Sequence, residues 1–338
     1  MLKKKIYVVF TGGTIGSSVQ SGAVDLDGST ASLLIAKYRE MYGNGISFEE
    51  FRPVSLLSEN IRVEDLGKMV ACVRGLDLSD CDGIILTHGT DTLSFTANYF
   101  SQILCDLPVP LVLVSALYPL EDARSNGLEN FAGAIMLIES GIKGIFVSYR
   151  NPGEATCKIH LASRILETEA FFGGMNSLGG VHFGEIREGK FLRNEDPRNP
   201  LPEALAKGGT PAEPALCTDV LTIRARALLD FSLYEFSEKK PKAVLLELYH
   251  SGTVCTQGEA TDFLGFCKRC RAAGVPVVVS PLDSSAFLYA SASELAEYCI
   301  LARDVGFGMT IVKVMLALGA GRPIERTLEE NLAFEKLI

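Results

Sequence analysis

Short apolar runs rich in β-branched residues recur along this chain and alternate with stretches of helical periodicity. Fully apolar strands separated by helices are typical of a parallel sheet that is covered on both faces. The pattern therefore predicts an α/β fold in which helices connect neighbouring strands. We interpret the following runs as buried strands: residues 6–10, 83–86, 111–114, 144–147, 243–246 and 275–279.

Two segments between these strands carry clear helical signals. In residues 63–74 the apolar side chains recur at helical spacing. Residues 92–104 begin behind Asp91 and Thr92, which are both residue types that favour the N-cap position. We therefore expect a helix in each segment.

The composition changes beyond residue 185. Charged residues and prolines crowd positions 193–200, and Gly208, Gly209 and further prolines follow. Such residues end regular structure and are typical of a linker. A length of 338 residues agrees with two domains. We expect a larger N-terminal domain with a mostly parallel sheet covered by helices in residues 1–190, a linker in residues 191–215, and a smaller α/β domain in residues 216–338.

The overall charge disfavours some partners. The net charge is −9 and the pI is near 5.1, which argues against a nucleic-acid or anionic-membrane surface. The apolar run that follows the basic N-terminus ends at Thr11, too early for a secretory signal or a membrane helix. We expect a cytoplasmic protein that binds a small molecule.

Nine cysteines are scattered along the chain, and most lie in apolar contexts. Cys267 and Cys270 have CxxC spacing, which a redox or zinc site would also show. A zinc site needs a second pair or nearby histidines, and none follows in the sequence. We expect the pair to lie on a helix within residues 262–273, and we expect no metal site.

Two threonine-rich strings follow the first two predicted strands. Residues 11–16 read TGGTIG, and residues 87–92 read THGTDT. In open α/β sheets, ligands bind at the carboxyl ends of the strands. The two strings can therefore bring two hydroxyls and a carboxylate to one crevice.

A dinucleotide site is one alternative for the first string, because a glycine-rich turn after a strand is its usual setting. Gly13 and Gly16 fill two of the three glycine positions of that fingerprint, but Thr11 stands at the first. The acidic residue expected about 20 positions later has no clear counterpart. Hydroxyl catalysis explains the string better.

A threonine hydroxyl becomes nucleophilic when a neighbouring base removes its proton. Thr11 or Thr90 could be the nucleophile, and Asp91 could orient a base or hold a substrate ammonium group. A lysine could be the base if burial brings its pKa from about 10.4 towards about 7–8. One histidine without a partner is not a site, so we expect a structural role for His88.

The two strings resemble the signature strings of the bacterial asparaginase/glutaminase family, in their order and separation as well as in their residues. The resemblance implies that Thr11 is the primary nucleophile and that Thr90 and Asp91 are the second threonine and its carboxylate. It also implies that Lys158 completes a Thr–Lys–Asp triad. Val24 stands where the family usually carries a lid tyrosine; Asp25 or Asp27 could take its place.

The resemblance further implies where substrate is held and what the reaction is. Ser58 and Glu59 resemble the loop that binds the α-amino and α-carboxylate groups, together with Asp91, and Gly89 and Ala116 resemble backbone positions lining the same pocket. The implied reaction is hydrolysis of L-asparagine to L-aspartate and ammonia through a threonine acyl-enzyme, without a cofactor. The implied assembly is a homodimer or homotetramer with sites at the subunit interface.

Other functions remain open from the sequence. A non-hydrolytic amino-acid-binding or regulatory protein could use the same fold, and the substrate could be glutamine or another amide. The related subunit that feeds ammonia to a tRNA-dependent amidotransferase carries an extra N-terminal domain. Because the first predicted strand begins near Ile6, we do not favour that subunit.

Overall fold

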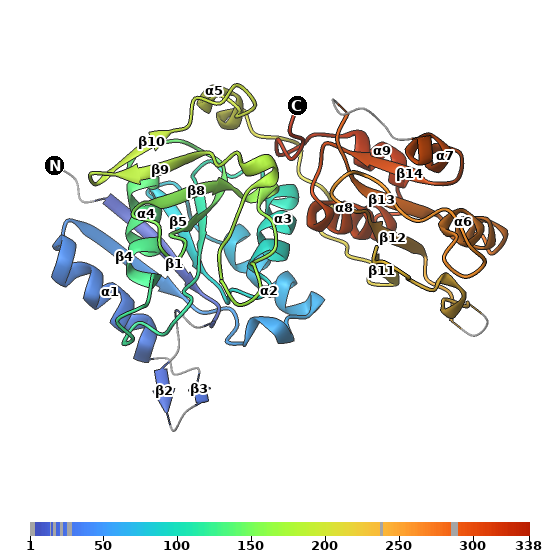
Figure 1. The fold of residues 1–338 in the computed structure, drawn as a ribbon. Helices are drawn as coiled ribbons and strands as arrows, with labels where there is room; N and C mark the ends of the chain where they lie inside the picture. Colours follow the sequence, from blue (N-terminus) through green and yellow to red (C-terminus); the bar gives the residue numbers. More distant parts are fainter. Residues whose placement is uncertain are drawn as a thin grey trace. The chain divides into compact units, whose positions relative to one another are not determined.

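The computed structural model describes residues 4–13, 15, 18–20, 23–25, 29–236, 239–284 and 290–338. The chain forms two compact units (Figure 1). Unit 1 comprises Met1–Ala212 with Leu332–Phe334, and unit 2 comprises Glu213–Asn331 with Glu335–Ile338. The mixed α/β class predicted from the apolar runs is confirmed.

Unit 1 contains an eight-stranded sheet in the order β10-β9-β8-β7-β6-β5-β1-β4. The five strands from β7 to β4 are parallel, whereas β8, β9 and β10 continue the sheet in antiparallel pairs. The strands are β1 (Lys4–Phe10), β4 (Ile46–Phe51), β5 (Gly83–Thr87), β6 (Leu111–Val114), β7 (Ile145–Tyr149), β8 (Cys157–Leu161), β9 (Gly184–Arg187) and β10 (Lys190–Arg193).

Helices cover this sheet because each buries an apolar face against it. The main helices of unit 1 are α1 (Ser29–Tyr42), α2 (Val63–Arg74), α3 (Leu93–Ile103) and α4 (Gly127–Glu139). Both helices predicted for this part of the chain, residues 63–74 and 92–104, are therefore confirmed within one residue.

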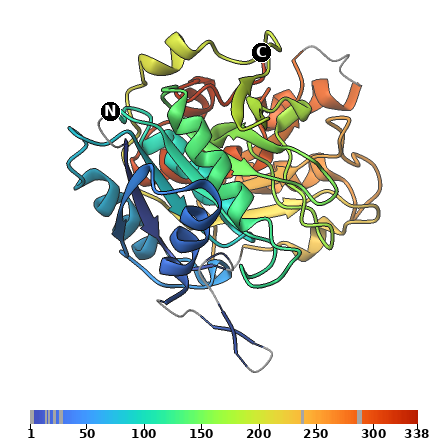
Figure 2. The same cartoon turned by 90° about the vertical axis from the view of Figure 1, so that its left-hand side faces the viewer.

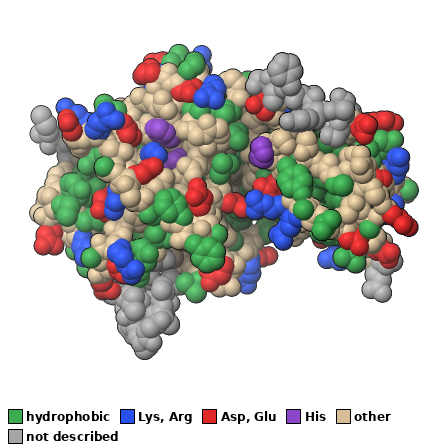
Figure 3. Space-filling model, viewed as in Figure 1, with side chains coloured by type: hydrophobic (Ala, Val, Ile, Leu, Met, Phe, Trp, Pro, Cys, Tyr) green, Lys and Arg blue, Asp and Glu red, His purple; other side chains and the backbone are tan. Residues whose placement is uncertain are grey.

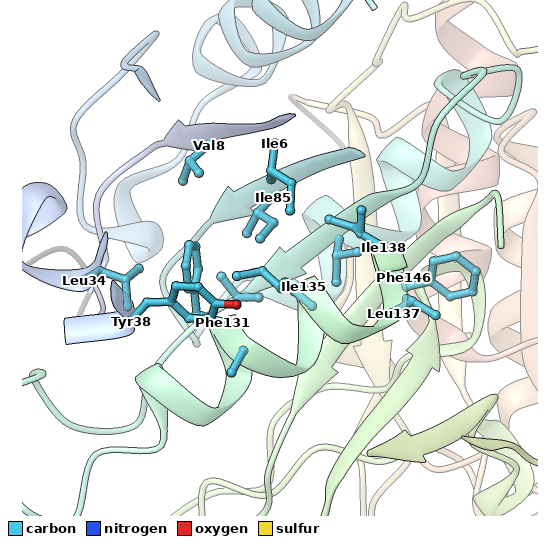
Figure 4. Packing of buried hydrophobic residues seen from close by; sticks show 14 of the residues in the cluster. Ile6, Val8, Leu34, Tyr38, Ile85, Phe131, Ile135, Leu137, Ile138 and Phe146 are labelled. Carbon is cyan, nitrogen blue, oxygen red and sulfur yellow. The ribbon is translucent and has the colours of Figure 1, made fainter. Parts of the chain in front are cut away.

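The core of unit 1 lies between the sheet and α4. Phe131 and Ile135 of α4 pack with Ile6 of β1 and Ile85 of β5, and Tyr38 of α1 joins them (Figure 4). All but Tyr38 are at most 1% exposed, and Tyr38 is 7% exposed. Burial of this apolar surface fixes β1 beside β5, and it thereby fixes the loops that follow these two strands.

A separate two-stranded ribbon, β2 (Ser18–Gln20) and β3 (Ala23–Asp25), pairs only with itself within the described residues. Figure 2 shows it standing out from the rest of unit 1. Val24 lies in β3, but its side chain and the whole of Asp27 fall outside the described part of the chain.

Unit 2 is a smaller sheet of four parallel strands, β11 (Val220–Arg224), β12 (Ala243–Glu247), β13 (Val277–Leu282) and β14 (Ile300–Arg303). Successive residues of β12 belong to different cores: Val244 and Leu246 pack on one face, and Ala243 and Leu245 pack on the other. The sheet is thus covered on both faces, by helices α6 (Phe263–Ala272), α7 (Ala290–Tyr298), α8 (Phe307–Gly319) and α9 (Ile324–Glu329).

The segment expected as a linker, residues 191–215, has regular structure of its own. Its first residues belong to β10. Pro197 and Pro200 precede the short helix α5 (Pro202–Ala206), Pro202 occupies the first turn of that helix, and Pro211 and Pro214 follow it. Proline is favoured in the first turn because the N–H groups of that turn have no acceptor within the helix, so the N–H that proline lacks is not needed. The division between the two units falls at Ala212, close to the end of this segment.

The cysteine pair lies on α6, as expected, and both thiols are buried in the apolar core of unit 2. Asp262 is the N-cap residue of this helix, and its carboxylate accepts a hydrogen bond from the Leu264 N–H at 3.0 Å. Within the described ranges, no group of three or more His, Cys, Asp or Glu side chains is arranged to hold a metal ion. Among the same residues, no helix combines the length and apolar character needed to cross a bilayer.

Candidate active site

The two threonine strings meet at neighbouring strand ends. Strands β1 and β5 are parallel partners, and Phe10 lies in register with Thr87. A Cβ added to Gly13 would lie 2.4 Å from the Gly89 nitrogen, so the two turns touch through backbone alone. Gly13 also has a φ of +78°, which favours glycine. The first glycine-rich string is therefore needed for the close approach of the turns.

Ser58 is brought to the same place by a short 3-10 turn, Ser58–Asn60. A Cβ added to Gly89 would lie 2.4 Å from the Ser58 hydroxyl oxygen. The Thr92 hydroxyl donates a hydrogen bond to the Ser58 carbonyl oxygen at 2.9 Å. The serine is therefore fixed against the second threonine turn.

A pocket of about 690 Å³ opens beside these turns. Its lining includes five of the residues expected at the site: Ser58, Glu59, Gly89, Thr90 and Asp91. The other lining residues are Gly13, Leu57, Leu117, Glu167, Thr168, Glu169, Ala170, Phe171 and Gly173.

Thr90 is held from two directions. Its hydroxyl donates to the Ala116 carbonyl oxygen at 3.1 Å, so Ala116, two residues after β6, contacts the site without lining the pocket. The Thr168 hydroxyl donates to the Thr90 carbonyl oxygen at 3.1 Å. Thr90 is partly exposed and lines the pocket.

Thr11 occupies a different environment from Thr90. Its side chain is 2% exposed, and its hydroxyl donates to the Thr87 carbonyl oxygen at 2.6 Å. It does not line the pocket in the described conformation. To attack a substrate, the Thr11 hydroxyl would have to leave this hydrogen bond.

Lys158 is not brought to the pocket. It lies on β8, and β7 and β6 stand between β8 and β5. Three strand spacings of about 4.8 Å therefore separate it laterally from the strand that leads to Thr90. Its ammonium group pairs with Glu154 instead, at 2.5 Å between Nζ and Oε1. Among the described residues Lys158 does not line the pocket, and its place in a Thr–Lys–Asp triad stays a prediction.

His88 has the structural role expected from the sequence. The ring is buried; Nδ1 donates to the Gly89 carbonyl oxygen at 2.8 Å, and the Thr96 hydroxyl donates to Nε2 at 3.0 Å. Burial disfavours the charged imidazolium and lowers the pKa of His88 to about 4. The neutral ring therefore supports the turn that carries Gly89 and Thr90.

The segment Glu167–Gly173 lines the pocket and was missed by sequence reasoning. It follows β8 and carries no motif, and the only local signal is the glycine pair Gly173–Gly174, which is typical of a turn. The buried Tyr149 hydroxyl donates to the Gly173 carbonyl oxygen at 2.9 Å and anchors the segment to the end of β7. We call residues 167–173 the acidic wall, because Glu167 and Glu169 belong to it.

A comparison with known proteins identifies the group to which the chain belongs. The family model described as "Asparaginase, N-terminal" matches residues 5–195. The chain belongs to the asparaginase family. The resemblance of its two threonine strings is thereby confirmed, as is the prediction of an amidohydrolase enzyme.

Individual relatives support the assignment over most of the chain. An L-asparaginase from Thermococcus kodakarensis is 26% identical over 98% of both chains. A component of the glutamyl-tRNA(Gln) amidotransferase from Haloquadratum walsbyi is 28% identical over 47% of this chain and 36% of its own. The solved structure of the thermostable L-asparaginase from T. kodakarensis superposes with a TM-score of 0.80 at 24% identity, over 98% of this chain and 99% of that one, and shows the same fold.

The charged side chains that line the pocket of this asparaginase-family protein are all acidic among the described residues. Glu59, Asp91, Glu167 and Glu169 line it, whereas no lysine, arginine or histidine does among the residues that the structure describes. On the face of the molecule seen in Figure 3, by contrast, Lys and Arg side chains lie among the Asp and Glu side chains. The pocket therefore favours a ligand that carries a positive charge.

Proposed function

We propose that this protein hydrolyses the side-chain amide of L-asparagine to L-aspartate and ammonia through a threonine acyl-enzyme. Membership of the asparaginase family supports the reaction class, and the relative from T. kodakarensis, an L-asparaginase that matches over nearly the whole chain, supports the substrate. One observation carries the proposal. A partly exposed threonine hydroxyl, that of Thr90, lines a pocket beside the carboxylate of Asp91.

Thr90 is the hydroxyl that this pocket presents to a substrate. In the first step its oxygen attacks the amide carbonyl carbon, the carbon–nitrogen bond breaks, and the amide nitrogen leaves as ammonia after gaining a proton. In the second step a water molecule cleaves the ester, which releases aspartate and restores the hydroxyl. Carboxylates are the only side chains among the described lining residues that can accept the hydroxyl proton at neutral pH.

Substrate is held by the groups around this hydroxyl. The Asp91 carboxylate pairs with the α-ammonium group, and the Ser58 hydroxyl donates to the α-carboxylate. Gly89 leaves room for both, since a side chain there would meet the serine oxygen. Glu59 completes this side of the pocket.

Thr11 has a supporting role in this mechanism. Its hydrogen bond to the Thr87 carbonyl oxygen links the residue that follows β1 to the last residue of β5, where the two turns begin. The role of primary nucleophile that the resemblance gives to Thr11 needs a rearrangement of this bond. The Thr90 hydroxyl would likewise have to release its hydrogen bond to the Ala116 carbonyl oxygen before a base takes its proton, but Thr90 already lines the pocket.

The assembly and the cellular location belong to the same proposal. We expect a homodimer or homotetramer with active sites at the subunit interface, as in the family that the sequence resembles, and a cytoplasmic enzyme. The reaction needs neither a metal ion nor an organic cofactor, because the threonine supplies the nucleophile.

A coupled assay for ammonia over asparagine, glutamine and simple amides tests the proposal. Purified protein is expected to release ammonia from asparagine, and Thr90→Val is expected to abolish the release. No ammonia from any amide would contradict it.

A second candidate, a non-hydrolytic amino-acid-binding protein, is favoured by the placement of Lys158 outside the pocket, since the expected base is then missing. Calorimetry distinguishes the two. Tight binding of asparagine without ammonia release supports the binding protein.

A further inference from the structure

Three cysteine thiols of unit 2 meet in the apolar core that α6 covers. Cys267 and Cys270 are three residues apart on α6, so their side chains lie on the same face of that helix, and both are fully buried. Cys299 packs against the same core from the junction between α7 and β14. The fold therefore brings a third thiol, distant in the sequence, to the CxxC pair.

Cys267 and Cys299 are in direct contact. Their sulfur atoms lie 3.5 Å apart, whereas a disulfide bond requires about 2.05 Å. The gap of about 1.5 Å is small enough for rotation about the two Cα–Cβ bonds to close it. Cys299 lies between the last residue of α7 and the first residue of β14, so neither element holds it in a regular backbone conformation.

The same geometry does not favour a metal ion in this cluster. A thiolate site for zinc requires its ligands to converge on one point. Among the side chains that the structure describes, no three of the types Cys, His, Asp and Glu are arranged in that way. The contact between Cys267 and Cys299 instead has the arrangement that a disulfide requires, in which two sulfur atoms face each other.

The two thiols differ in protonation and in access from solvent. The hydrogen bond to Cys299 and burial in the core raise the pKa of Cys267, so the Cys267 thiol stays protonated. Cys299 is only partly buried. A small oxidant therefore meets the Cys299 sulfur first, and Cys267 is the thiol placed to react with the oxidised product.

We propose that Cys299 and Cys267 form an oxidation site, at which a hydroperoxide produces a reversible disulfide bond within unit 2. The Cys299 sulfur attacks one peroxide oxygen, the oxygen–oxygen bond breaks, and water or an alcohol leaves, so that Cys299 becomes a sulfenic acid. The Cys267 sulfur then attacks the Cys299 sulfur, and the sulfur–oxygen bond breaks. The hydroxyl group leaves as water with the Cys267 proton. The two thiols lose two electrons in total, and the peroxide gains them.

This inference is independent of the proposed amide hydrolysis, because all of its residues belong to unit 2. The bond would join α6 to the residue that precedes β14, across 32 positions of the chain. A thiol such as dithiothreitol would break it by exchange and restore both cysteines.

The experiment treats the folded full-length protein with hydrogen peroxide, blocks the remaining thiols by alkylation, and identifies linked peptides by mass spectrometry without reduction. The proteins are the wild type, Cys299→Ser, Cys267→Ala, and the matched control Cys255→Ser, which changes an exposed cysteine. Digestion with trypsin and a glutamyl endopeptidase separates Cys267 from Cys255, because Glu259 lies between them. Dimedone is added in a parallel reaction to label sulfenic acids.

The wild type and the control are expected to give a peptide that links Cys267 to Cys299, and dithiothreitol is expected to remove it. Neither of the other variants should give it, and Cys267→Ala should accumulate a dimedone label on Cys299. The inference is overturned if both cysteines of the treated wild type remain alkylated, if Cys299 is linked to Cys270 or to a second chain instead, or if the link forms only in urea.

Discussion

The Thr90 hydroxyl donates a hydrogen bond to the carbonyl oxygen of Ala116 at 3.1 Å. This bond joins the turn after β5 to the loop after β6, and it orients the hydroxyl of a residue that lines the pocket. The carbonyl oxygen can only accept, so the Thr90 proton points towards it and the oxygen lone pairs remain for other partners. A nucleophile in this geometry is pre-oriented before substrate binds.

The first prediction concerns this hydroxyl. Thr90→Val keeps the shape of the side chain but removes the oxygen, so kcat should fall by at least about 10³, as for other lost nucleophiles. Thr90→Ser should retain much of the activity. Thr222→Val changes an exposed threonine on β11 and is the matched control. Steady-state ammonia release measures all three, and wild-type turnover by Thr90→Val would rule out the assigned role.

The second prediction follows from the placement of Lys158. Because its ammonium group pairs with Glu154 at the far side of β7 and β6, Lys158→Met should change kcat/KM by less than about threefold. The ion pair is partly exposed, so its loss should also cost little stability. A loss of activity of about 10³ with an unchanged melting temperature would show instead that Lys158 acts in catalysis.

The third prediction tests the contact between the two threonine turns. Gly13 and Gly43 both have positive φ, +78° and +87°, but only a Cβ on Gly13 would meet other atoms, the nearest being the Gly89 nitrogen at 2.4 Å. Gly43→Ala should cost about 1 kcal/mol for its backbone conformation alone. Gly13→Ala should cost at least about 2 kcal/mol more, because backbone atoms must move apart.

Urea unfolding of the two glycine variants and the wild type provides the comparison. Gly43→Ala is the control for the conformational cost, since nothing lies within 4 Å of its added Cβ. Equal unfolding midpoints for the two variants would mean that the turns do not touch as described.

The fourth prediction concerns pH. In the folded protein burial lowers the pKa of His88 to about 4 and that of His160 to about 3, whereas an unfolded histidine titrates near 6.5. Below pH 6.5 the unfolded chain therefore binds protons that the folded chain excludes. The free energy of unfolding should fall as the pH drops from about 6.5 to about 4, with a slope of up to about 1.4 kcal/mol per pH unit for each histidine.

His88→Gln isolates one contribution to this slope. Glutamine can donate and accept hydrogen bonds but does not titrate, so the variant should lose stability less steeply between pH 6.5 and 4. Urea unfolding at several pH values measures the slope. A variant with the wild-type slope would show that His88 is not the buried neutral group described here.

Much of the fold could be predicted because its signals are local. The apolar run at residues 6–10 became β1, and the helical spacing of residues 63–74 became α2. Strand β4 (Ile46–Phe51) was not predicted, because its two consecutive glutamates interrupt the apolar pattern. It forms nevertheless, since pairing with β1 satisfies its backbone at the sheet edge.

The candidate site shows the same division between local and distant information. The turns at Thr11 and Thr90 follow adjacent parallel strands, so their meeting could be expected from the strand ends alone. The position of Lys158 depends on strand order, which depends on pairing between distant segments. The insertion of β6 and β7 between β5 and β8 leaves no signal in the neighbourhood of Lys158. The acidic wall follows β8, which is separated from β5 by β7 and β6. Its place beside Thr90 therefore depends on the same distant pairing and could not be predicted from the sequence.

Trapping of the covalent intermediate tests the central claim most directly. Wild-type protein mixed with asparagine, quenched in acid and digested should show an aspartyl adduct on the peptide that contains Thr90 in mass spectrometry. The Thr90→Val variant should show none. An adduct confined to the peptide that contains Thr11, or ammonia release with no adduct on either peptide, would contradict the assignment of Thr90 as the nucleophile.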